Sequence, residues 1–215
     1  MGDVKIEVWS DYVCPFCYIG KRKLENALEK TGLGNRAEVV FKSYELDPQS
    51  PETSEESMVS VLARKYGTTE AEAEGMTANV TAAAKEVGLE YNFSKMRPAN
   101  TFSAHRLAKW AEEQGKASEM SENLLRAYFI ENREIGRKEV LADIAEETGL
   151  DRKEAEAALG SGRYEEDVRA DIEEARQLGV QGVPFFVINR KYAVSGAQPD
   201  EVFEQALRKV AEEES

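Results

Sequence analysis

Two cysteines separated by two residues constrain this chain more than any other feature. Cys14 and Cys17 are the only cysteines among 215 residues, and they lie in the run Cys-Pro-Phe-Cys. The preceding residues 4–9 alternate apolar and polar side chains, which predicts a strand. Residues 20–30 carry apolar side chains at helical spacing. The cysteine pair is therefore expected at a strand-to-helix junction, with Cys14 near the N-terminus of the helix.

That position has a chemical consequence for the two thiols. The N-terminus of a helix favours an anion, because its first backbone N–H groups are unpaired and the helix dipole is positive there. Cysteines at helix N-termini and in Cys-x-x-Cys motifs ionise more readily than a free thiol. Since the thiolate is the form that attacks disulfides, Cys14 is the predicted nucleophile and Cys17 the predicted resolving thiol. Pro15 suits the first helical turn, where its missing N–H would have no partner.

Other interpretations of the cysteine pair stay open at this point. Two cysteines and the single histidine, His105, do not complete a tetrahedral zinc site within one chain, although a site shared across a dimer could. A structural disulfide spanning two residues closes too short a loop to constrain the unfolded chain much. In a reducing cytosol a lone Cys-x-x-Cys pair is more typical of redox or metal chemistry. We predict a redox dithiol and no metal.

Charge and hydropathy exclude several classes of partner. The net charge of −13 makes nucleic acid an unfavourable partner, because its phosphates would be repelled. The sequence has no run of roughly 18 apolar residues, so no membrane-spanning helix is expected. The N-terminus lacks a basic segment followed by an apolar one, as a secretory leader would have. These observations predict a cytoplasmic protein that binds neither nucleic acid nor membrane.

The remaining sequence predicts an α/β fold with a helical insertion. Residues 38–44 form a second predicted strand, so that strand, helix and strand make a βαβ unit with parallel neighbours. From residue 57 to residue 178 the composition favours helices. They are expected at 57–66, 69–87, from Asn100 or Thr101 onward, 117–131, 137–147, 151–159 and 162–178. The runs 182–188 and 191–195 then predict an antiparallel hairpin, and a final amphipathic helix opens at Pro199 and Asp200.

Three segments together resemble the DsbA-type oxidoreductases of the thioredoxin fold, and more closely their FrnE-like branch. The segments are Trp9 to Cys17, Asn100 to Arg106 and Gly179 to Phe186. The resemblance implies a central mixed sheet flanked by helices, with a large helical subdomain inserted into it. Residues 1–56 and 179–215 would form the thioredoxin-like domain. Residues 57–178 would form the insertion, with its last helix packed back on that domain.

The resemblance also implies how substrate is bound. The peptide bond before Pro184 would be cis and would face the cysteines, and Val183 would offer its backbone to an extended substrate strand, as in β-augmentation. A trans proline that begins an edge strand is the alternative. Pro15 and Phe16 would complete the substrate-binding surface. Phe16 is a departure from the pattern, because DsbA-type oxidants often carry histidine between the cysteines. A phenyl ring would not stabilise the Cys14 thiolate as an imidazolium would.

Two polar residues of the insertion are further candidates. His105 is expected either to be a hydrogen-bonded core residue or to lie over the cysteines, where it would orient substrate or relay a proton. Asn100 is expected to cap its helix, with contact to bound substrate as the second interpretation. Both are therefore included among the predicted substrate-binding residues.

We predict a thiol–disulfide oxidoreductase or isomerase that needs no bound cofactor and acts on protein or small-molecule thiols and disulfides. It could form a homodimer, and glutathione could serve as a substrate. One alternative is a glutathione-dependent transferase or isomerase of the kappa-class or 2-hydroxychromene-2-carboxylate isomerase type. Those enzymes resemble the chain in their helical insertion but typically place serine where Cys14 stands. The other alternative is a non-catalytic, chaperone-like module that binds peptides in an apolar groove.

Overall fold

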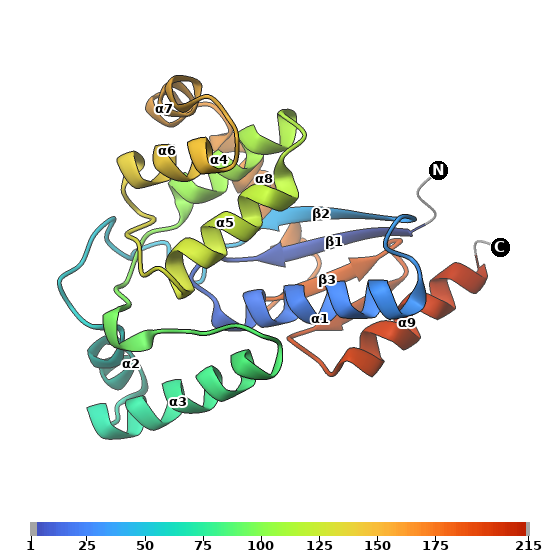
Figure 1. The fold of residues 1–215 in the computed structure, drawn as a ribbon, viewed down its shortest axis with the longest axis horizontal. Helices are drawn as coiled ribbons and strands as arrows, with labels where there is room; N and C mark the ends of the chain where they lie inside the picture. Colours follow the sequence, from blue (N-terminus) through green and yellow to red (C-terminus); the bar gives the residue numbers. More distant parts are fainter. Residues whose placement is uncertain (1–3, 214–215) are drawn as a thin grey trace.

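A computed structural model describes residues 4–213, and in this part of the chain a four-stranded mixed sheet is combined with nine α-helices. The strands lie in the order β2-β1-β3-β4. Figure 1 shows the sheet in the middle of the molecule, with α1 and α9 along its lower side. The helices α4 to α7 lie above the sheet in the same view, and α2 and α3 form a separate pair at the lower left.

The N-terminal βαβ unit is confirmed. β1 (Val4–Ser10) and β2 (Ala37–Ser43) are parallel neighbours joined by α1 (Pro15–Thr31). Cys14 is the N-cap of α1, so the Cys-Pro-Phe-Cys run forms the entry to the helix and its first turn. The helix ends at Gly32, whose φ of 69° lies in the left-handed region that glycine adopts without steric cost.

The segment between β2 and β3 is helical, as its composition predicts. Ser57 accepts a hydrogen bond from the backbone N–H of Ser60 and starts the first of these helices. Thr69 and Glu72 form a capping box at the start of the second. One 3₁₀ turn, Phe93–Lys95, lies between the second and the third of these helices. The helices are α2 (Met58–Tyr66), α3 (Glu70–Glu86), α4 (Phe102–Glu113), α5 (Ala117–Phe129), α6 (Lys138–Glu147), α7 (Arg152–Gly160) and α8 (Glu165–Gln177).

The C-terminal part completes the sheet with the predicted hairpin and closing helix. β3 (Phe185–Ile188) pairs antiparallel with both β1 and β4 (Tyr192–Ser195). Asn189 and Arg190 both have positive φ in the turn between them, a conformation that asparagine tolerates better than most residues. The chain ends in α9 (Asp200–Glu213).

The described residues form two large apolar clusters, and one of them reaches the cysteine turn. One fills the space between the sheet and the helices α1 and α9, where each fully buried Leu, Ile or Phe contributes about 1.5–3 kcal/mol. The other joins the inserted helices to one another, and it includes Tyr12, Tyr18 and Ile19 from either side of the cysteines. The residues before and after the cysteines are thus fixed by packing against the helical segment.

A polar cluster also ties α1 to α5. Glu122 of α5 accepts hydrogen bonds from Tyr18 Oη at 2.6 Å and Lys21 Nζ at 2.6 Å, and it pairs with Arg22. Burial alone would raise the pKa of Glu122, but hydrogen bonds from Arg22, Lys21 and Tyr18 outweigh it and lower the pKa to about 2. The first helix of the sheet layer is therefore held against the helical segment by charge as well as by apolar packing.

At Gly136, two loops that are distant in sequence approach each other closely. A Cβ atom at Gly136 would clash with the carbonyl oxygen of Glu52. Only glycine allows the loop after β2 to pass so near the connection between α5 and α6. The same loop is tied to the start of α4, because Asn100 N–H donates to Pro51 O at 2.9 Å. The loop after β2 is therefore anchored to the helical segment.

Candidate redox site

The two cysteines form the centre of the candidate site. Both are free thiols, with 4% of Cys14 and 3% of Cys17 exposed. Cys17 N–H donates to the Cys14 carbonyl at 3.0 Å, which closes the turn. Cys14 is the N-cap residue of α1 and its side chain makes no capping hydrogen bond, but its sulfur is carried at the positive end of the helix dipole. This is the arrangement that the spacing of the motif predicts.

The environment of Cys17 keeps its thiol protonated. Burial is the main cause that raises its pKa well above the usual value, and the hydrogen bond and charge of Cys14 act in the same direction. The N–H of Asp11 donates to Cys17 Sγ at 3.4 Å and opposes the shift in part. The two thiols are therefore unequal, with Cys14 at the entry to the helix and Cys17 in a setting that disfavours its thiolate.

The segment before β3 lies directly against Cys14. The Val183–Pro184 peptide bond is cis, and Cys14 Sγ donates to the carbonyl oxygen of Val183 at 3.4 Å. Gly20 allows α1 to approach this segment, because a Cβ there would lie 2.9 Å from Pro184 Cγ. Two stretches that are 169 residues apart in sequence thus meet at the nucleophile position.

A buried pair of polar side chains lies on the other side of Cys17. Asp11 is fully buried, and its Oδ1 lies 3.2 Å from Nε2 of His105, which is 2% exposed. Its Oδ2 accepts a hydrogen bond from Leu46 N–H at 2.8 Å. The ring of His105 also packs against that of Tyr12, with centroids 4.8 Å apart. His105 therefore lies close to the cysteine turn, and its contact with that turn runs through Asp11.

A tyrosine from the helical segment fixes the cysteine turn directly. Tyr91 Oη donates to the carbonyl oxygen of Pro15 at 2.7 Å. Its ring is stacked on that of Phe129 at a centroid separation of 4.7 Å. The loop between α3 and α4 thus contributes a partly buried hydrogen bond to the residue that follows Cys14.

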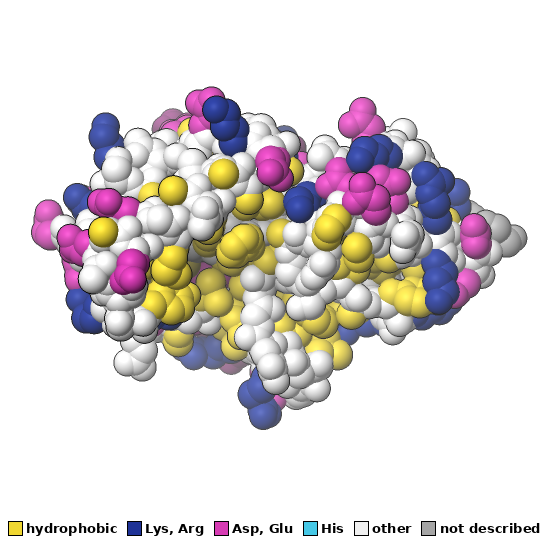
Figure 2. Space-filling view, turned by 90° about the horizontal axis from the view of Figure 1, so that it is seen from below, with side chains coloured by type: hydrophobic (Ala, Val, Ile, Leu, Met, Phe, Trp, Pro, Cys, Tyr) yellow, Lys and Arg dark blue, Asp and Glu magenta, His cyan; other side chains and the backbone are white. Residues whose placement is uncertain are grey.

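The surface around the site is apolar. Phe16 is 44% exposed and Leu46 is 42% exposed, although both are large hydrophobic residues. Pro15 and Val183 are half-buried. Seen from the side of α1, α2 and α3, apolar side chains gather across the middle of the molecule, in a shallow hollow (Figure 2). An exposed apolar surface of this kind is typical of a site that binds another molecule.

The side chain of Asn100 forms two hydrogen bonds to nearby backbone groups. Its Oδ1 accepts a hydrogen bond from Phe102 N–H at 3.0 Å, and its Nδ2 donates to Pro48 O at 3.2 Å. The N-cap position of α4 is Thr101, whose side chain makes no capping hydrogen bond. Asn100 thus supplies the side-chain bond at the start of the helix and holds the loop after β2.

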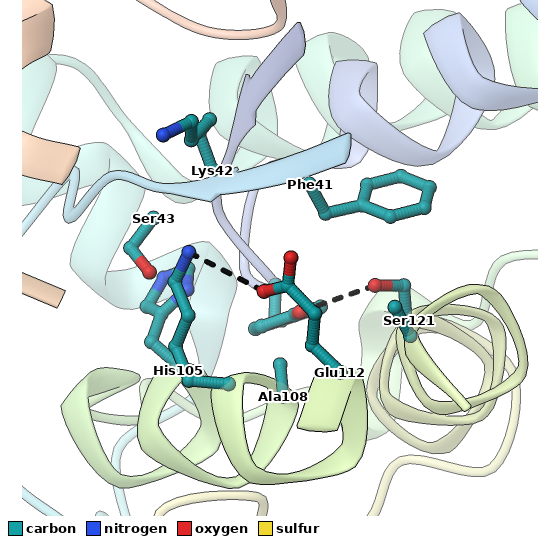
Figure 3. Close-up of a pocket in the computed structure, with 10 residues that line it drawn as sticks. Phe41, Lys42, Ser43, His105, Ala108, Glu112 and Ser121 are labelled. Carbon is teal, nitrogen blue, oxygen red and sulfur yellow. Dashed lines mark hydrogen bonds and ion pairs between the residues drawn. The ribbon is translucent and has the colours of Figure 1, made fainter. Parts of the chain in front are cut away.

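A small cavity lies beyond His105, at the edge of β2. It is lined by Tyr12 and by residues of β2, α4 and α5, and neither cysteine borders it. In Figure 3, His105, Glu112 and Ser121 face this cavity, and Ser43 and Phe41 lie on its strand side. Tyr12 Oη and Ser121 Oγ are 3.3 Å apart within the same group.

The sequence analysis did not identify Asp11 or Tyr91 as parts of the site. One feature of the sequence could have pointed to Asp11, because it is an acidic residue three positions before the motif. Tyr91 carried none, because it lies in an irregular loop far from the cysteines in sequence. Within residues 4–213, no group of three or more His, Cys, Asp or Glu side chains could hold a metal ion. In the same range, no helix combines the length and the apolar character that crossing a bilayer requires.

Comparison with known proteins places this geometry in a family. The chain matches the family described as DSBA-like thioredoxin domain over residues 5–208. It is 31% identical over 207 residues to the uncharacterised protein YwbO of Bacillus subtilis, covering 95% of this chain and 96% of that protein.

Two solved structures show the same fold. A probable DsbA oxidoreductase from Streptomyces coelicolor is 39% identical and superposes with a TM-score of 0.93, covering 98% of this chain and 91% of that one. The cytosolic disulfide reductase DsbM from Pseudomonas aeruginosa, solved with GSH, is 17% identical, with a TM-score of 0.68 over 97% of this chain and 99% of its own. The predicted thioredoxin-like fold with a helical insertion is confirmed. The chain belongs to the DSBA-like thioredoxin domain family, a family of disulfide oxidoreductases that act on thiols and disulfides.

Proposed function

We propose that the chain is a thiol–disulfide oxidoreductase in which Cys14 is the nucleophile and Cys17 the resolving thiol. The inequality of the two sulfurs carries this proposal. Cys14 is the N-cap of α1 and contacts the Val183 carbonyl beside an apolar surface. Cys17 lies one turn further in, where burial raises its pKa. A reactive outer thiol and a protonated inner thiol are what a two-step exchange requires.

The exchange moves two electrons between the cysteine pair and the substrate. In the reducing direction, the Cys14 thiolate attacks one sulfur of a substrate disulfide, and the other substrate sulfur leaves with the electron pair of the broken bond. Cys17 then loses its proton and attacks Cys14 Sγ. The bond between Cys14 and the substrate breaks, so that the substrate leaves as a dithiol and the cysteines form a disulfide. The oxidising direction is the reverse.

We propose that Val183, Pro184, Pro15 and Phe16 form the surface on which an extended substrate lies. The contact between Cys14 and the Val183 carbonyl supports this, because a peptide that pairs with that backbone would pass beside the sulfur. The exposed ring of Phe16 would add apolar contact. The substrate contact predicted for Asn100 stays a prediction. The two hydrogen bonds that its side chain forms hold the start of α4 and the loop after β2.

Several broader predictions accompany this proposal. We propose that residues 57–178 are an insertion between the two parts of a thioredoxin-like domain, residues 1–56 and 179–215. The FrnE-like assignment, the cytoplasmic location and the possible homodimer stay predictions from the sequence. Glutathione as a substrate gains support from one observation, since a cytosolic reductase of the same fold has been solved with GSH.

Reduction of insulin by dithiothreitol tests the proposal. The unaltered protein is expected to accelerate it, and Cys14→Ser is expected to abolish the acceleration. Cys17→Ser should still attack once, so it should accumulate a mixed disulfide that mass spectrometry detects. Ser10→Ala, which removes a buried hydroxyl just before the motif, is the matched control and should retain activity.

The two alternatives give different results in the same set of variants. A glutathione-dependent transferase or isomerase would turn over only with glutathione present and would tolerate Cys17→Ser. A chaperone-like module would suppress aggregation of an unfolded protein equally well when both cysteines are serine. Full activity of the Cys14→Ser variant on insulin would contradict the proposed role of Cys14.

A further inference from the structure

The thiolate of Cys14 needs a hydrogen-bond donor that its thiol does not use. In the reduced protein the Cys14 thiol donates to the carbonyl oxygen of Val183 at 3.4 Å. Once the thiol has lost its proton, its sulfur only accepts hydrogen bonds and can no longer bond to that carbonyl. Only 4% of Cys14 is exposed, so water has little access to the sulfur. A donor within the protein would therefore stabilise the anion.

The first turn of α1 offers one backbone N–H for this purpose. Pro15 has no N–H, and the N–H of Cys17 donates to the Cys14 carbonyl at 3.0 Å. Phe16 lies between them, and within the described residues 4–213 its N–H has no hydrogen-bond partner. Phe16 is the second residue of the helix, a position whose N–H commonly bonds to the side chain of the N-cap residue. The Phe16 N–H is therefore the donor available to the Cys14 sulfur.

The hydroxyl of Tyr91 bonds to the other end of the same peptide group. Tyr91 Oη donates at 2.7 Å to the carbonyl oxygen of Pro15, and that carbonyl is joined to the Phe16 N–H through one peptide bond. A hydrogen bond to an amide oxygen draws electron density from the amide nitrogen, so linked hydrogen bonds strengthen one another. The bond from Tyr91 therefore makes the Phe16 N–H a better donor to a thiolate.

Packing fixes the position of the Tyr91 hydroxyl. The ring is stacked on that of Phe129 of α5 with centroids 4.7 Å apart, and Phe93 packs edge-on against it at 5.9 Å. The next residue of the loop is held as well, because Asn92 N–H donates to the Phe129 carbonyl at 3.2 Å. Only 7% of Tyr91 is exposed. The helical segment thus presents a donor to the cysteine turn at a fixed place.

The titratable groups near Cys14 leave Tyr91 in its donor form. Burial raises the pKa of Tyr91, and the charges of Cys14, Tyr18 and Cys17 add to the rise. Burial also raises the pKa of Tyr18 and that of Cys17. The carboxylate of Asp11, which follows β1, is bonded to other partners, and the segment between α8 and β3 carries no charged residue. Tyr91 therefore keeps its proton where Cys14 ionises.

We propose that Tyr91 is a positioning residue for the nucleophile: through the peptide group of Pro15 and Phe16, it aims and polarises the N–H that stabilises the Cys14 thiolate. It acts through that peptide group rather than on the sulfur itself. By stabilising the ionised, reduced form, it makes the thiolate more abundant at neutral pH and the disulfide of the two cysteines more oxidising. This inference rests on the proposed function and assigns to the helical segment a part in setting the reactivity of its nucleophile.

The pH dependence of Cys14 alkylation by iodoacetamide, measured on the reduced full chain, tests the proposal. Tyr91→Phe keeps the stacked ring and removes only the donor. It is expected to move the midpoint of the profile upward by about 0.5 pH unit, so that alkylation below the midpoint slows about threefold. Mass spectrometry of the modified peptide verifies that the label is on Cys14.

Equilibration of the cysteine pair with a glutathione redox buffer gives a second readout. Loss of the donor destabilises the thiolate form and leaves the disulfide form as it was. At a pH above both midpoints, the equilibrium constant for oxidation of the pair by glutathione disulfide should therefore rise about threefold in Tyr91→Phe.

Tyr128→Phe is the matched control. Tyr128 is buried, packs edge-on against the same Phe129 at 4.9 Å, and donates its hydroxyl to the Arg97 carbonyl at 2.8 Å. The control variant should lose stability to a similar extent but leave both readouts unchanged. Tyr91→3-fluorotyrosine supplies a stronger donor and should lower the midpoint, a change of opposite sign that loosened packing would not produce.

The outcomes separate this inference from the proposed function. If the unaltered protein does not accelerate insulin reduction, the proposed function fails. If it does, but Tyr91→Phe leaves both readouts unchanged or moves them the other way, the inference alone is overturned. Equal shifts in Tyr91→Phe and Tyr128→Phe also overturn it. Should Tyr91→Phe fail to fold, the fluorotyrosine variant decides, and an unchanged or raised midpoint is then the contrary result.

Discussion

The two faces of the sheet are built from alternate residues of the same strands, yet they are stabilised in different ways. On the face toward α1 and α9, Val4 and Ile6 of β1 are fully buried in an apolar cluster with Phe203. On the face toward α8, Glu7 and Trp9 of the same strand are buried to a similar extent. That second face, which we term the ionic face, combines a small apolar cluster with several paired charges.

Asp171 of α8 is the centre of the ionic face. Its carboxylate lies 3.0 Å from Lys42 Nζ and 2.6 Å from Lys109 Nζ, and it accepts a hydrogen bond from Ser43 N–H at 2.9 Å. Its backbone carbonyl accepts a hydrogen bond from Trp9 Nε1 at 2.9 Å. Each of these contacts fixes a direction as well as a distance, so together they set the position of α8 on the sheet.

The rest of the ionic face comes from the hairpin turn. Arg190 pairs with Glu7 of β1 and with Glu174 of α8. Lys42 and Arg190 each lie 5.9 Å from the ring centroid of Trp9, a geometry suited to cation–π attraction. Strand, helix and hairpin are therefore joined through one aromatic ring and its charged neighbours.

The two faces are stabilised by different interactions, and these interactions contribute differently to the fold. Apolar burial is non-directional and stabilises in proportion to area. Buried ion pairs carry a desolvation cost that offsets much of their attraction, so their net effect on stability is small while the loss of one partner is costly. We expect the apolar face to supply stability and the ionic face to supply register. α8 ends at Gln177, six residues before Val183.

The largest expected effect is on the apolar face. Phe203→Ala should lower the free energy of unfolding by about 4 kcal/mol, because it removes a fully buried ring that packs edge-on against Phe186 and leaves a cavity. Urea denaturation followed by circular dichroism measures the change. Val202→Ala alters the neighbouring, 37% exposed residue of the same helix and should shift stability by less than about 0.5 kcal/mol. A similar loss in both variants would contradict the assignment of the core.

The second-largest expected effect comes from removing the charge of Asp171 on the ionic face. Asp171→Asn should cost about 3 kcal/mol, because Lys42 and Lys109 then lose the buried carboxylate that they share and keep only the more exposed Glu174 and Glu112. The amide keeps an acceptor for Ser43 N–H, so the loss reports charge rather than shape. Asp167→Asn changes an exposed residue of the same helix and should be neutral within about 0.5 kcal/mol. Equal stability of the Asp171 variant and the unaltered protein in urea would indicate that the lysines are solvated.

A third prediction sharpens the comparison by removing the charges together. Asp171→Asn combined with Lys42→Met and Lys109→Met should recover stability to within about 1–2 kcal/mol of the unaltered protein, because no buried charge is then unpaired. The unfolding free energies of the single and combined variants give the coupling directly. Simple addition of the single losses would mean that the three side chains do not act as a unit.

The apolar face could be predicted from the sequence, and the ionic face could not. Val4, Ile6 and Val8 alternate with polar residues, and that pattern gives the strand and its buried side. The same alternation assigns Glu7 to solvent, whereas Arg190, which is 183 residues away, covers it. A polar residue at a strand position shows its burial only when its partner is known, and the partner comes from the tertiary fold.

The candidate site likewise has a part that could be predicted from the sequence and a part that could not. Cys14 at the helix N-terminus follows from local pattern, and its approach to Val183 was implied by the family resemblance. His105 was identified as a candidate because it is the single histidine, but its partner Asp11 lies 94 residues away. Tyr91 was missed because no periodicity marks a loop residue whose hydroxyl reaches the cysteine turn. Short-range pattern located the sulfurs, while the groups that surround them depend on long-range packing.

The smallest expected effect is a pH dependence confined to the ionic face. Partial burial alone would raise the pKa of Glu174, but its bonds to Arg190 and Lys42 outweigh burial and hold the pKa below its usual value. Because the folded-state pKa is the lower one, the stabilisation is complete above about pH 5 and is lost as the pH falls through that pKa. Glu174→Gln should therefore flatten the acid limb of the stability curve, measured by urea denaturation at several pH values. Phe203→Leu should lower the whole curve without changing the slope of that limb, because an apolar substitution alters no proton binding. If the two variants gave the same acid slope, the charges of the ionic face would have no part in the acid sensitivity of the fold.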